Sequence, residues 1–244
     1  MLGKQKAKYI QSLGQKKQRD EEGLFIAEGP KIVAELLAST PESFEGIYAV
    51  SSWLDVHGRS HPSVNMVTVT SDELEKISQL KTPNQVVAVL RKFEEQETVA
   101  VKGKISLVLD SIRDPGNLGT IIRIADWFGL SQVICSLDCA DAYNPKVVQA
   151  TMGSVARVRV FYTDIEAWLP QQHELNIYGT MLDGKDVTRM DRISEGLIIV
   201  GNESTGIRLE VAELVTEKIT IPGKGGAESL NAGVAVGIVL SHLL

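Results

Sequence analysis

The sequence predicts an α/β protein whose larger, C-terminal part holds a parallel sheet. Three observations lead to this prediction. Short β-branched runs alternate with helical segments from residue 105 to the C-terminus, which is the pattern of α/β domains. The run at 105–109 is typical of a strand buried in a parallel sheet. Glycine-containing turns follow three of the predicted strands, and such turns bind nucleotides and cofactors in α/β proteins.

The composition is that of a soluble globular protein. The chain of 244 residues is long enough for one large domain or two modest ones, and 43% of its residues are hydrophobic. No apolar signal segment opens the sequence, and the longest apolar stretch, 232–240, is about half of a bilayer span. Cys135 and Cys139 have no histidine nearby. We therefore expect reduced thiols, no metal site, no membrane partner and a cytoplasmic protein.

Residues 21–93 are predicted to form a small α/β unit. Pro30 suits the first position of a helix over 31–38, and Ser71 is expected to cap a second helix. Strands are expected at 24–28, 46–50, 64–69 and 86–90. A polar, acid-rich stretch after this unit is typical of a linker. The predicted organisation is an N-terminal domain at 1–93 with a basic arm at 1–19, a linker at 94–104, and a second domain at 105–244.

The second domain is expected to alternate strands and helices along its whole length. Strands are predicted at 105–109, 133–135, 158–161, 177–180, 197–200 and 219–221. Helices are predicted at 118–128, 145–152, 165–169, 208–215 and from 228 to the C-terminus. The carboxyl ends of parallel strands meet at one edge of a sheet, so the turns that follow them are expected to converge.

Positive charge is concentrated at the N-terminus. The formal net charge is −6, yet residues 1–19 carry six Lys or Arg and no acid. A basic stretch of this kind is either a nucleic-acid contact or an ordinary solvated tail. The charge pattern alone leaves both interpretations open.

Three loops carry polar residues beyond what a turn needs. They lie at 109–120, 200–206 and 221–231, each directly after a predicted strand. Each candidate in them also has a plain structural interpretation: Asn117 as a helix cap, Glu203 as a solvated turn acid, and Ser229 with Asn231 as a helix start. Arg123 lies in an otherwise apolar helix, where a buried arginine needs a partner or a function. No Ser-His-Asp triad, metal-ligand pattern or phosphate loop is present, so the residues predict an α/β enzyme with a cofactor-sized site.

These loops resemble the three motifs of the SpoU/TrmH family, RNA ribose 2′-O-methyltransferases of the SPOUT superfamily. The matching segments are 114–120 with Arg123, 201–206, and 221–222 with 228–231. Their order and spacing are similar to the family over roughly residues 105–244.

Two other segments carry a weaker resemblance. Residues 25–30 are similar to the N-terminal substrate-binding domain of the family, and residues 144–153 also resemble it. Many members carry arginine where this chain has Gln149.

The resemblance implies a fold, a cofactor and a set of site residues. It implies a trefoil-knotted α/β domain behind a small RNA-binding domain, a homodimer, and rRNA in preference to tRNA as the substrate. It implies S-adenosylmethionine as the cofactor, held mainly by backbone near four residues: Thr180, Gly201, Ile221 and Leu230. It implies a catalytic group of five residues: Asn117, Arg123, Glu203, Ser229 and Asn231.

The role of Arg123 and the reaction itself each have alternatives. The family assigns a base-like role to this arginine, but a guanidinium stays protonated under ordinary conditions. We therefore favour phosphate binding and stabilisation of the developing alkoxide by Arg123. The alternatives to ribose methylation are a non-catalytic RNA-binding or ribosome-assembly protein that retains the fold, and a methyltransferase that acts on bases.

Overall fold

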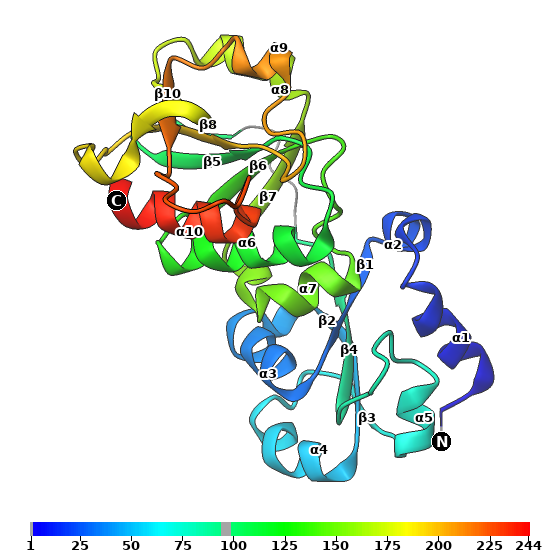
Figure 1. Cartoon of the computed structure of the whole chain (residues 1–244). Helices are drawn as coiled ribbons and strands as arrows, with labels where there is room; N and C mark the ends of the chain where they lie inside the picture. Colours follow the sequence, from blue (N-terminus) through cyan, green and yellow to red (C-terminus); the bar gives the residue numbers. More distant parts are fainter. Residues whose placement is uncertain (1, 94–98) are drawn as a thin grey trace. The chain divides into compact units, whose positions relative to one another are not determined.

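The computed structural model describes residues 2–93 and 99–244 (Figure 1). The described residues divide into two compact units, one made of 2–93 and 141–156 and the other of 99–140 and 157–244. They are called unit 1 and unit 2 here. Residues 94–98 of the predicted linker lie outside the described residues.

Unit 1 is built on a four-stranded mixed sheet in the order β1-β4-β2-β3. β4 is antiparallel to both β1 and β2, and β2 is parallel to β3. The strands are β1 (Leu24–Glu28), β2 (Phe44–Ala49), β3 (Met66–Thr68) and β4 (Val86–Arg91). The helices are α1 (Lys4–Ser12), α2 (Lys16–Glu22), α3 (Pro30–Ser39), α4 (Ser51–His57), α5 (Ser71–Glu75) and α7 (Pro145–Thr151), with short 3-10 turns at Pro41–Ser43, Gly58–Ser60 and Ser154–Ala156.

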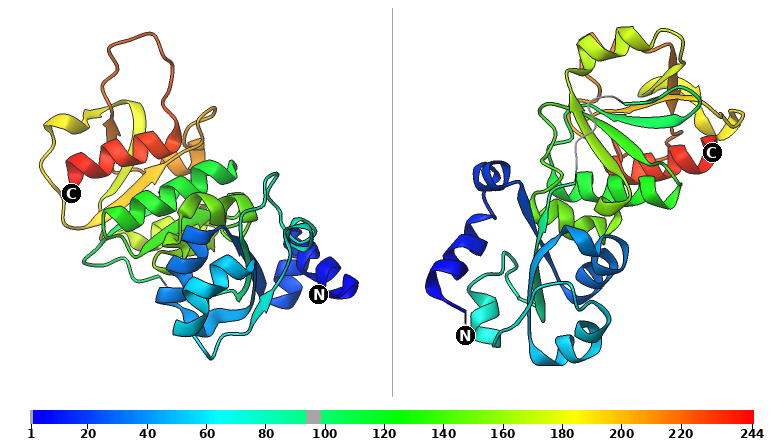
Figure 2. Two further views of the ribbon diagram at one scale, coloured as in Figure 1. Left: turned by 90° about the horizontal axis from the view of Figure 1, so that it is seen from below. Right: turned by 180° about the vertical axis from the view of Figure 1, so that it is seen from behind.

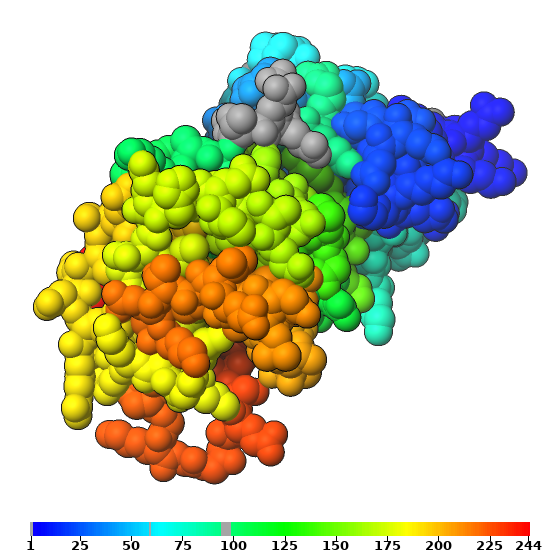
Figure 3. All heavy atoms as spheres, turned by 90° about the horizontal axis from the view of Figure 1, so that it is seen from above, coloured from blue at the N-terminus to red at the C-terminus, as the bar shows by residue number. Residues whose placement is uncertain are grey.

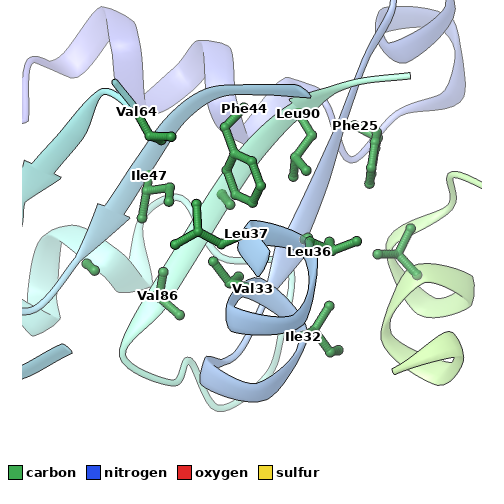
Figure 4. Close-up of a cluster of buried hydrophobic side chains, with 14 of the residues drawn as sticks. Phe25, Ile32, Val33, Leu36, Leu37, Phe44, Ile47, Val64, Val86 and Leu90 are labelled. Atoms are coloured by element: carbon green, nitrogen blue, oxygen red, sulfur yellow. The ribbon is translucent and has the colours of Figure 1, made fainter. Parts of the chain in front are cut away.

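Both faces of this sheet are covered, because alternate strand residues enter two different clusters. Val86 and Leu90 of β4 face the cluster that α3 completes, which Figure 4 shows with Val33, Leu36 and other apolar side chains. Val87 and Val89 face the opposite cluster. The two-residue period of a strand therefore accounts for a β4 that is apolar throughout.

The prediction of a basic arm at 1–19 is wrong, because residues 4–12 and 16–22 form the helices α1 and α2. Ile10 and Leu13 are fully buried in the second cluster of unit 1. Arg19 is only 1% exposed, and its Nη2 donates to Oδ2 of Asp141 at 2.5 Å. The charge count at the N-terminus could not reveal this structure, since the partner of Arg19 lies 122 residues further along the chain.

Residues 141–156 lie within the predicted second domain, but they pack with unit 1. Val148 of α7 and Val155 are buried in the same cluster as α3. The Tyr143 ring contacts Phe25 of β1 at a centroid separation of 4.9 Å. Apolar contacts thus group this segment with the N-terminal unit.

Unit 2 is built on a six-stranded sheet in the order β10-β8-β9-β5-β6-β7, in which every neighbouring pair is parallel. The strands are β5 (Ile105–Leu109), β6 (Gln132–Ser136), β7 (Arg159–Thr163), β8 (Ile177–Asp186), β9 (Gly196–Val200) and β10 (Glu217–Thr220). The helices are α6 (Pro115–Trp127), α8 (Ile165–Trp168), α9 (Leu209–Ala212) and α10 (Ala232–Leu243), with 3-10 turns at Leu169–Gln172 and Val187–Arg189. The predicted parallel sheet is confirmed.

Helices cover both faces of the unit 2 sheet, as Figures 1 and 2 show. α8 and α9 lie on one face, where Ile165 and Val211 pack with Val108 of β5. α6 and α10 lie side by side on the other. Gly233 of α10 comes so close to α6 that a Cβ there would lie 2.9 Å from Cγ2 of Thr120. This arrangement brings the N-terminus of α10 next to the N-terminal half of α6.

Candidate functional site

Polar residues from three loops meet at the carboxyl edge of the unit 2 sheet. β8, β9 and β5 are consecutive in the sheet, and β10 flanks β8. The loop after β5 leads into α6, the loop after β9 leads towards α9, and the loop after β10 leads into α10. The predicted convergence of the three loops follows from this strand order.

A hydrogen-bonded chain of three side chains joins these loops. Nδ2 of Asn117 donates to Oε1 of Glu203. Nδ2 of Asn231 donates to Oδ1 of Asn117 at 2.7 Å. Asn117 therefore uses its donor and its acceptor to link the loop after β9 to the start of α10.

The helix starts differ in detail from the predicted ones. The N-cap of α6 is Asp114, whose Oδ1 accepts a hydrogen bond from the Asn117 backbone at 2.8 Å. Asn117 is thus inside the helix, and its side chain is released from capping. Asn231 caps α10 through Oδ1, which accepts from the backbone of Gly233 and Val234, and still has its Nδ2 for Asn117. Capping and site contact are combined in one amide.

Two of the predicted catalytic residues are not joined to this chain of side chains. Arg123 is exposed on α6, and no hydrogen bond or ion pair within the described residues engages its guanidinium. The helix turns this position outwards, so the desolvation argument does not apply to it, and the catalytic role of Arg123 stays a prediction. Ser229 is likewise exposed, in the loop that precedes α10.

Three of the predicted cofactor-binding residues lie in or directly after neighbouring strands of the sheet. Thr180 follows the ladder between β8 and β9, and its Oγ1 donates to the carbonyl of Ile199 at 3.1 Å. Gly201 follows β9, and a Cβ there would overlap the backbone of Gly206 and Ile207. Ile221 follows β10, and Leu230 is 44% exposed just before α10. The sheet therefore brings the first three together, and the last loop adds the fourth.

The loop between β10 and α10 is exposed along its whole length, from residue 222 to 231. Gly223, Gly225 and Gly226 have no neighbouring atoms within 4 Å of a Cβ built on them. In Figure 3 this orange-red segment stands out from the surface of unit 2. Hydrogen bonds hold the loops after β5 and β9. The middle of the loop after β10, in contrast, has open space around it.

A buried ion pair at the end of β5 was not predicted from the sequence. Asp110 follows β5 directly and has no exposed surface, and its Oδ1 accepts from Nε of Arg208 at 2.7 Å. Burial acts to lower the pKa of Arg208, but the carboxylate of Asp110 outweighs this effect and raises it. A carboxylate directly after a buried strand was the available signal, since such a group needs a partner inside the fold.

A second polar group supports the turn after β5. Ser111 adopts a left-handed conformation with φ of 60°, and its Oγ donates to Oδ2 of Asp138 at 2.8 Å. Burial acts to raise the pKa of Asp138. Hydrogen bonds from Ser136, Arg113 and Ser111 outweigh this effect and hold the pKa well below its usual range. The ionised carboxylate anchors a turn that a non-glycine residue adopts only with strain.

Both cysteines are free thiols close to the same turn. Sγ of Cys139 accepts a hydrogen bond from the Ile112 backbone at 3.2 Å. Hydrogen bonding with Cys135, and with Ser136 and Ile112, lowers the pKa of Cys139 to about 7 against the effect of burial. Burial raises the pKa of Cys135 well above its usual value.

Within residues 2–93 and 99–244, no three His, Cys, Asp or Glu side chains lie close enough together to hold a metal ion. In the same residues, no helix has both the length and the apolar character needed to span a bilayer.

Comparison with known proteins places the sequence in a family. Residues 104–241 match the SpoU rRNA Methylase family, and residues 4–88 match the MRM3-like substrate binding domain. The chain is 31% identical over 242 residues to the 23S rRNA (guanosine(2553)-2′-O)-methyltransferase RlmP of Bacillus subtilis, covering 98% of this chain and 96% of the relative.

Solved structures agree with this placement over the whole chain. A TrmH-family protein from Porphyromonas gingivalis is 32% identical with a TM-score of 0.87, covering 100% of this chain and 98% of that one. An AdoMet-bound rRNA methyltransferase from Sinorhizobium meliloti is 29% identical with a TM-score of 0.85, covering 100% and 95%. The predicted family and α/β fold class are confirmed.

Proposed function

Because this chain belongs to the SpoU rRNA methylase family, we propose that it transfers a methyl group from S-adenosylmethionine to a ribose 2′-hydroxyl of rRNA. Unit 2 carries the reaction, and unit 1 binds the RNA substrate. The match of residues 4–88 to a substrate-binding domain supports this division.

One observation of the structure carries the proposal: the chain of hydrogen bonds from Glu203 through Asn117 to Asn231. It fixes an amide and a carboxylate at the carboxyl edge of a parallel sheet, where α/β proteins bind their ligands. Methyl transfer demands in-line placement of the attacking oxygen against the methyl group, and fixed polar groups provide such placement.

The edge fits S-adenosylmethionine through backbone and apolar groups. Gly201 lets the backbone of its own loop close against it at residues 206 and 207, which holds the turn after β9 close to the sheet edge, and Ile221 with the half-exposed Leu230 offers apolar surface to an adenine ring. The Thr180 hydroxyl donates to Ile199 and keeps its oxygen free to accept. The bound cofactor supplies an electrophilic methyl group on a sulfonium.

Arg123 binds the RNA phosphate next to the target ribose and stabilises the alkoxide that develops as the hydroxyl loses its proton. Its exposure and its lack of a partner among the described residues leave its five donors available. The proton passes to phosphate or water. Asn117, Glu203, Ser229 and Asn231 shape and orient the site.

A methylation assay with Arg123 variants tests this function. The purified chain is incubated with rRNA and labelled S-adenosylmethionine, and 2′-O-methyl positions are mapped. Arg123→Ala is expected to lower turnover by about 10²–10³-fold. Arg123→Lys is expected to recover part of this loss, because lysine keeps the charge without the bidentate geometry. The control is Arg189→Ala, an arginine of unit 2 whose side chain is 86% exposed.

One result would count against this function, and another would count against the proposed role of Arg123. No methylation by the wild-type chain, together with no binding of S-adenosylmethionine in a titration, would favour a non-catalytic RNA-binding protein. Near-wild-type turnover of Arg123→Lys would remove bidentate phosphate binding from the mechanism.

We further propose a homodimer, formed through α6 and α10. Trp127 of α6 is 86% exposed and Val234 of α10 is 51% exposed, and both belong to packed neighbouring helices. Apolar surface of this kind on adjacent helices is typical of an interface. Sedimentation velocity at micromolar concentration is expected to give the mass of a dimer, and a monomer there would contradict the proposal.

The trefoil knot and a cytoplasmic location are also proposals. The backbone of Ile193 donates to the carbonyl of Leu243, and Nη1 of Arg192 donates to that of Leu244. These bonds hold the segment before β9 against the end of α10. A chain acting on rRNA works where ribosomes are assembled, and fractionation of cells tests that location.

A further inference from the structure

Two consecutive residues at the end of β5 hold both ends of the loop that carries Glu203. Asp110 holds the far end, through the Arg208 backbone at 2.8 Å and the Arg208 Nε at 2.7 Å. Ser111 holds the near end, because its carbonyl accepts from Nδ2 of Asn202 at 3.0 Å. The loop at 201–208 is therefore anchored at two points to one strand end.

Within the loop, the turn is closed tightly. The backbones of Asn202 and Gly206 exchange two hydrogen bonds, at 3.1 and 2.8 Å. Oδ1 of Asn202 accepts from the Ser204 backbone at 2.9 Å. Glu203 projects from this turn, and its carboxylate reaches Asn117 of α6. The position of Glu203 thus depends on where the two anchors place the turn.

The Arg208 anchor is the stronger of the two. Asp110 is completely buried, and a buried carboxylate without a cation carries a large desolvation cost. The guanidinium also reaches Oε1 of Glu166 on α8 at 3.1 Å, which fixes its plane from the other side. Arg208 donates to no atom of Asn117, Glu203 or Asn231 within the described residues.

We propose that Arg208, through Asp110, is a positioning residue for methyl transfer, because it fixes the loop that presents Glu203 to Asn117. This inference rests on the proposed function. Arg208 does not touch the reacting groups, and its effect is transmitted by the loop backbone. Misplacement of a site group by about 1 Å costs on the order of 10²-fold in rate.

The test compares Arg208→Met, Arg208→Lys and Glu166→Gln in the full chain. Arg208→Met is expected to lower kcat at least tenfold with the KM for RNA changed less than about threefold. Arg208→Lys is expected to lie between Arg208→Met and wild type, because an ammonium restores the charge beside Asp110 without the fork that also reaches Glu166. Glu166→Gln is the matched control, since it leaves the Asp110 contact intact and its amide oxygen can still accept the hydrogen bond from Arg208, so its kcat is expected to stay near wild type.

Hydrogen exchange separates positioning from a general loss of structure. The amides of residues 203–206 are expected to exchange faster in Arg208→Met, while those of β7, at the edge of the sheet, keep their protection. A folded Arg208→Met with wild-type kcat would overturn the proposal, and so would a loss of kcat with unchanged exchange in the loop. If Arg208→Met does not fold, Arg208→Lys gives the same two measurements.

The exchange measurement also distinguishes the two proposals. If the wild-type chain methylates no RNA, the proposed function fails. Faster exchange of the loop in the variants would then show only that Arg208 holds this loop in place. The positioning proposal would fail together with the function. Wild-type methylation that Arg208→Met preserves would overturn the positioning proposal alone.

Discussion

Each unit buries a carboxylate at the carboxyl end of a strand, but the two have different partners. Glu28 ends β1 and is 4% exposed, and it accepts from Oγ of Ser78 and from the Gln79 backbone. Asp110 follows β5 with no exposed surface, and its main partner is the guanidinium of Arg208. One carboxylate is buried among neutral donors and the other against a cation.

Glu28 joins secondary-structure elements of unit 1, whereas Asp110 fixes the loop that carries Glu203. Burial raises the pKa of Glu28, so its ionised form is disfavoured, and its contacts tie β1 to the segment after α5. Asp110 pairs with a charge, and its bonds converge with those of Asn117 on one loop. In unit 2 the polar contacts gather at one edge of the sheet, whereas those of Glu28 hold the scaffold together. Substitutions in the two units are therefore expected to affect different measurements.

The largest expected effect comes from the centre of the site in unit 2. Asn117→Ala removes both links, to Glu203 and to Asn231, and is expected to lower kcat by about 10²–10³-fold with the melting temperature nearly unchanged. Asn117→Asp is expected to be at least as damaging, because it places a carboxylate against that of Glu203. Single-turnover methylation with saturating S-adenosylmethionine measures the effect.

The control for this prediction is Asn176→Ala, an exposed asparagine of unit 2 that precedes β8. It is expected to retain full activity. Equal activity in Asn117→Ala and Asn176→Ala would remove the chain of hydrogen bonds from the mechanism, and with it the contrast between the units.

The sequence predicted the convergence of the three loops better than it predicted the structure of the N-terminus. Asn117, Glu203 and Asn231 could be grouped from the sequence because each lies in the segment that follows a strand or at the start of the next helix, and strand order brings these segments together. Ser71 was predicted as a cap, but Thr70 caps α5 through a capping box with Glu73. Errors of one residue are expected where several capping residues stand in a row.

Long-range pairing explains what could not be predicted. Arg19 belongs to a stretch of six cations, and only folding brings it to Asp141, which leaves it buried. Arg208 lies outside the three recognisable loops, and its partner precedes it by 98 residues. Spacing along a sequence carries no information about such pairs, so a charged residue can look like a surface group and lie in the interior.

A smaller effect is expected from the lysines of α1, in unit 1. Lys16 pairs with Asp20 and Lys17 with Glu21, while Arg19 is buried. Lys4, Lys6 and Lys8 are exposed, and no ion pair within the described residues involves them. Their replacement by glutamine is expected to weaken RNA binding and to reduce the salt slope by up to about 2–3, at roughly 0.7–0.9 for each phosphate contact.

Binding titrations over a range of salt concentrations measure this slope, with Lys16→Gln/Lys17→Gln as the control. Binding of S-adenosylmethionine is expected to stay unchanged in both variants. Deleting the segment would not be informative, because Ile10 and Leu13 belong to the core of unit 1. An unchanged salt slope in the triple variant would assign RNA recognition to other surfaces and make α1 a purely structural helix.

The smallest expected effect concerns Glu28 and is seen in stability rather than activity. Because burial raises its pKa in the folded chain, the stability it contributes is fully present below the unfolded pKa of about 4.3 and is lost as pH rises through the folded pKa. Glu28→Gln keeps a carbonyl for the Gln79 backbone and can donate to Ser78, so it removes the pH dependence without removing the contacts. In urea unfolding between pH 4 and 8, the free energy of unfolding of Glu28→Gln is expected to rise relative to that of wild type as pH rises. The exposed control Glu75→Gln is expected to show no such change. A difference between Glu28→Gln and wild type that stays constant over this range would mean that Glu28 ionises in the folded chain as it does in the unfolded one, and the contrast with Asp110 would then rest on geometry alone.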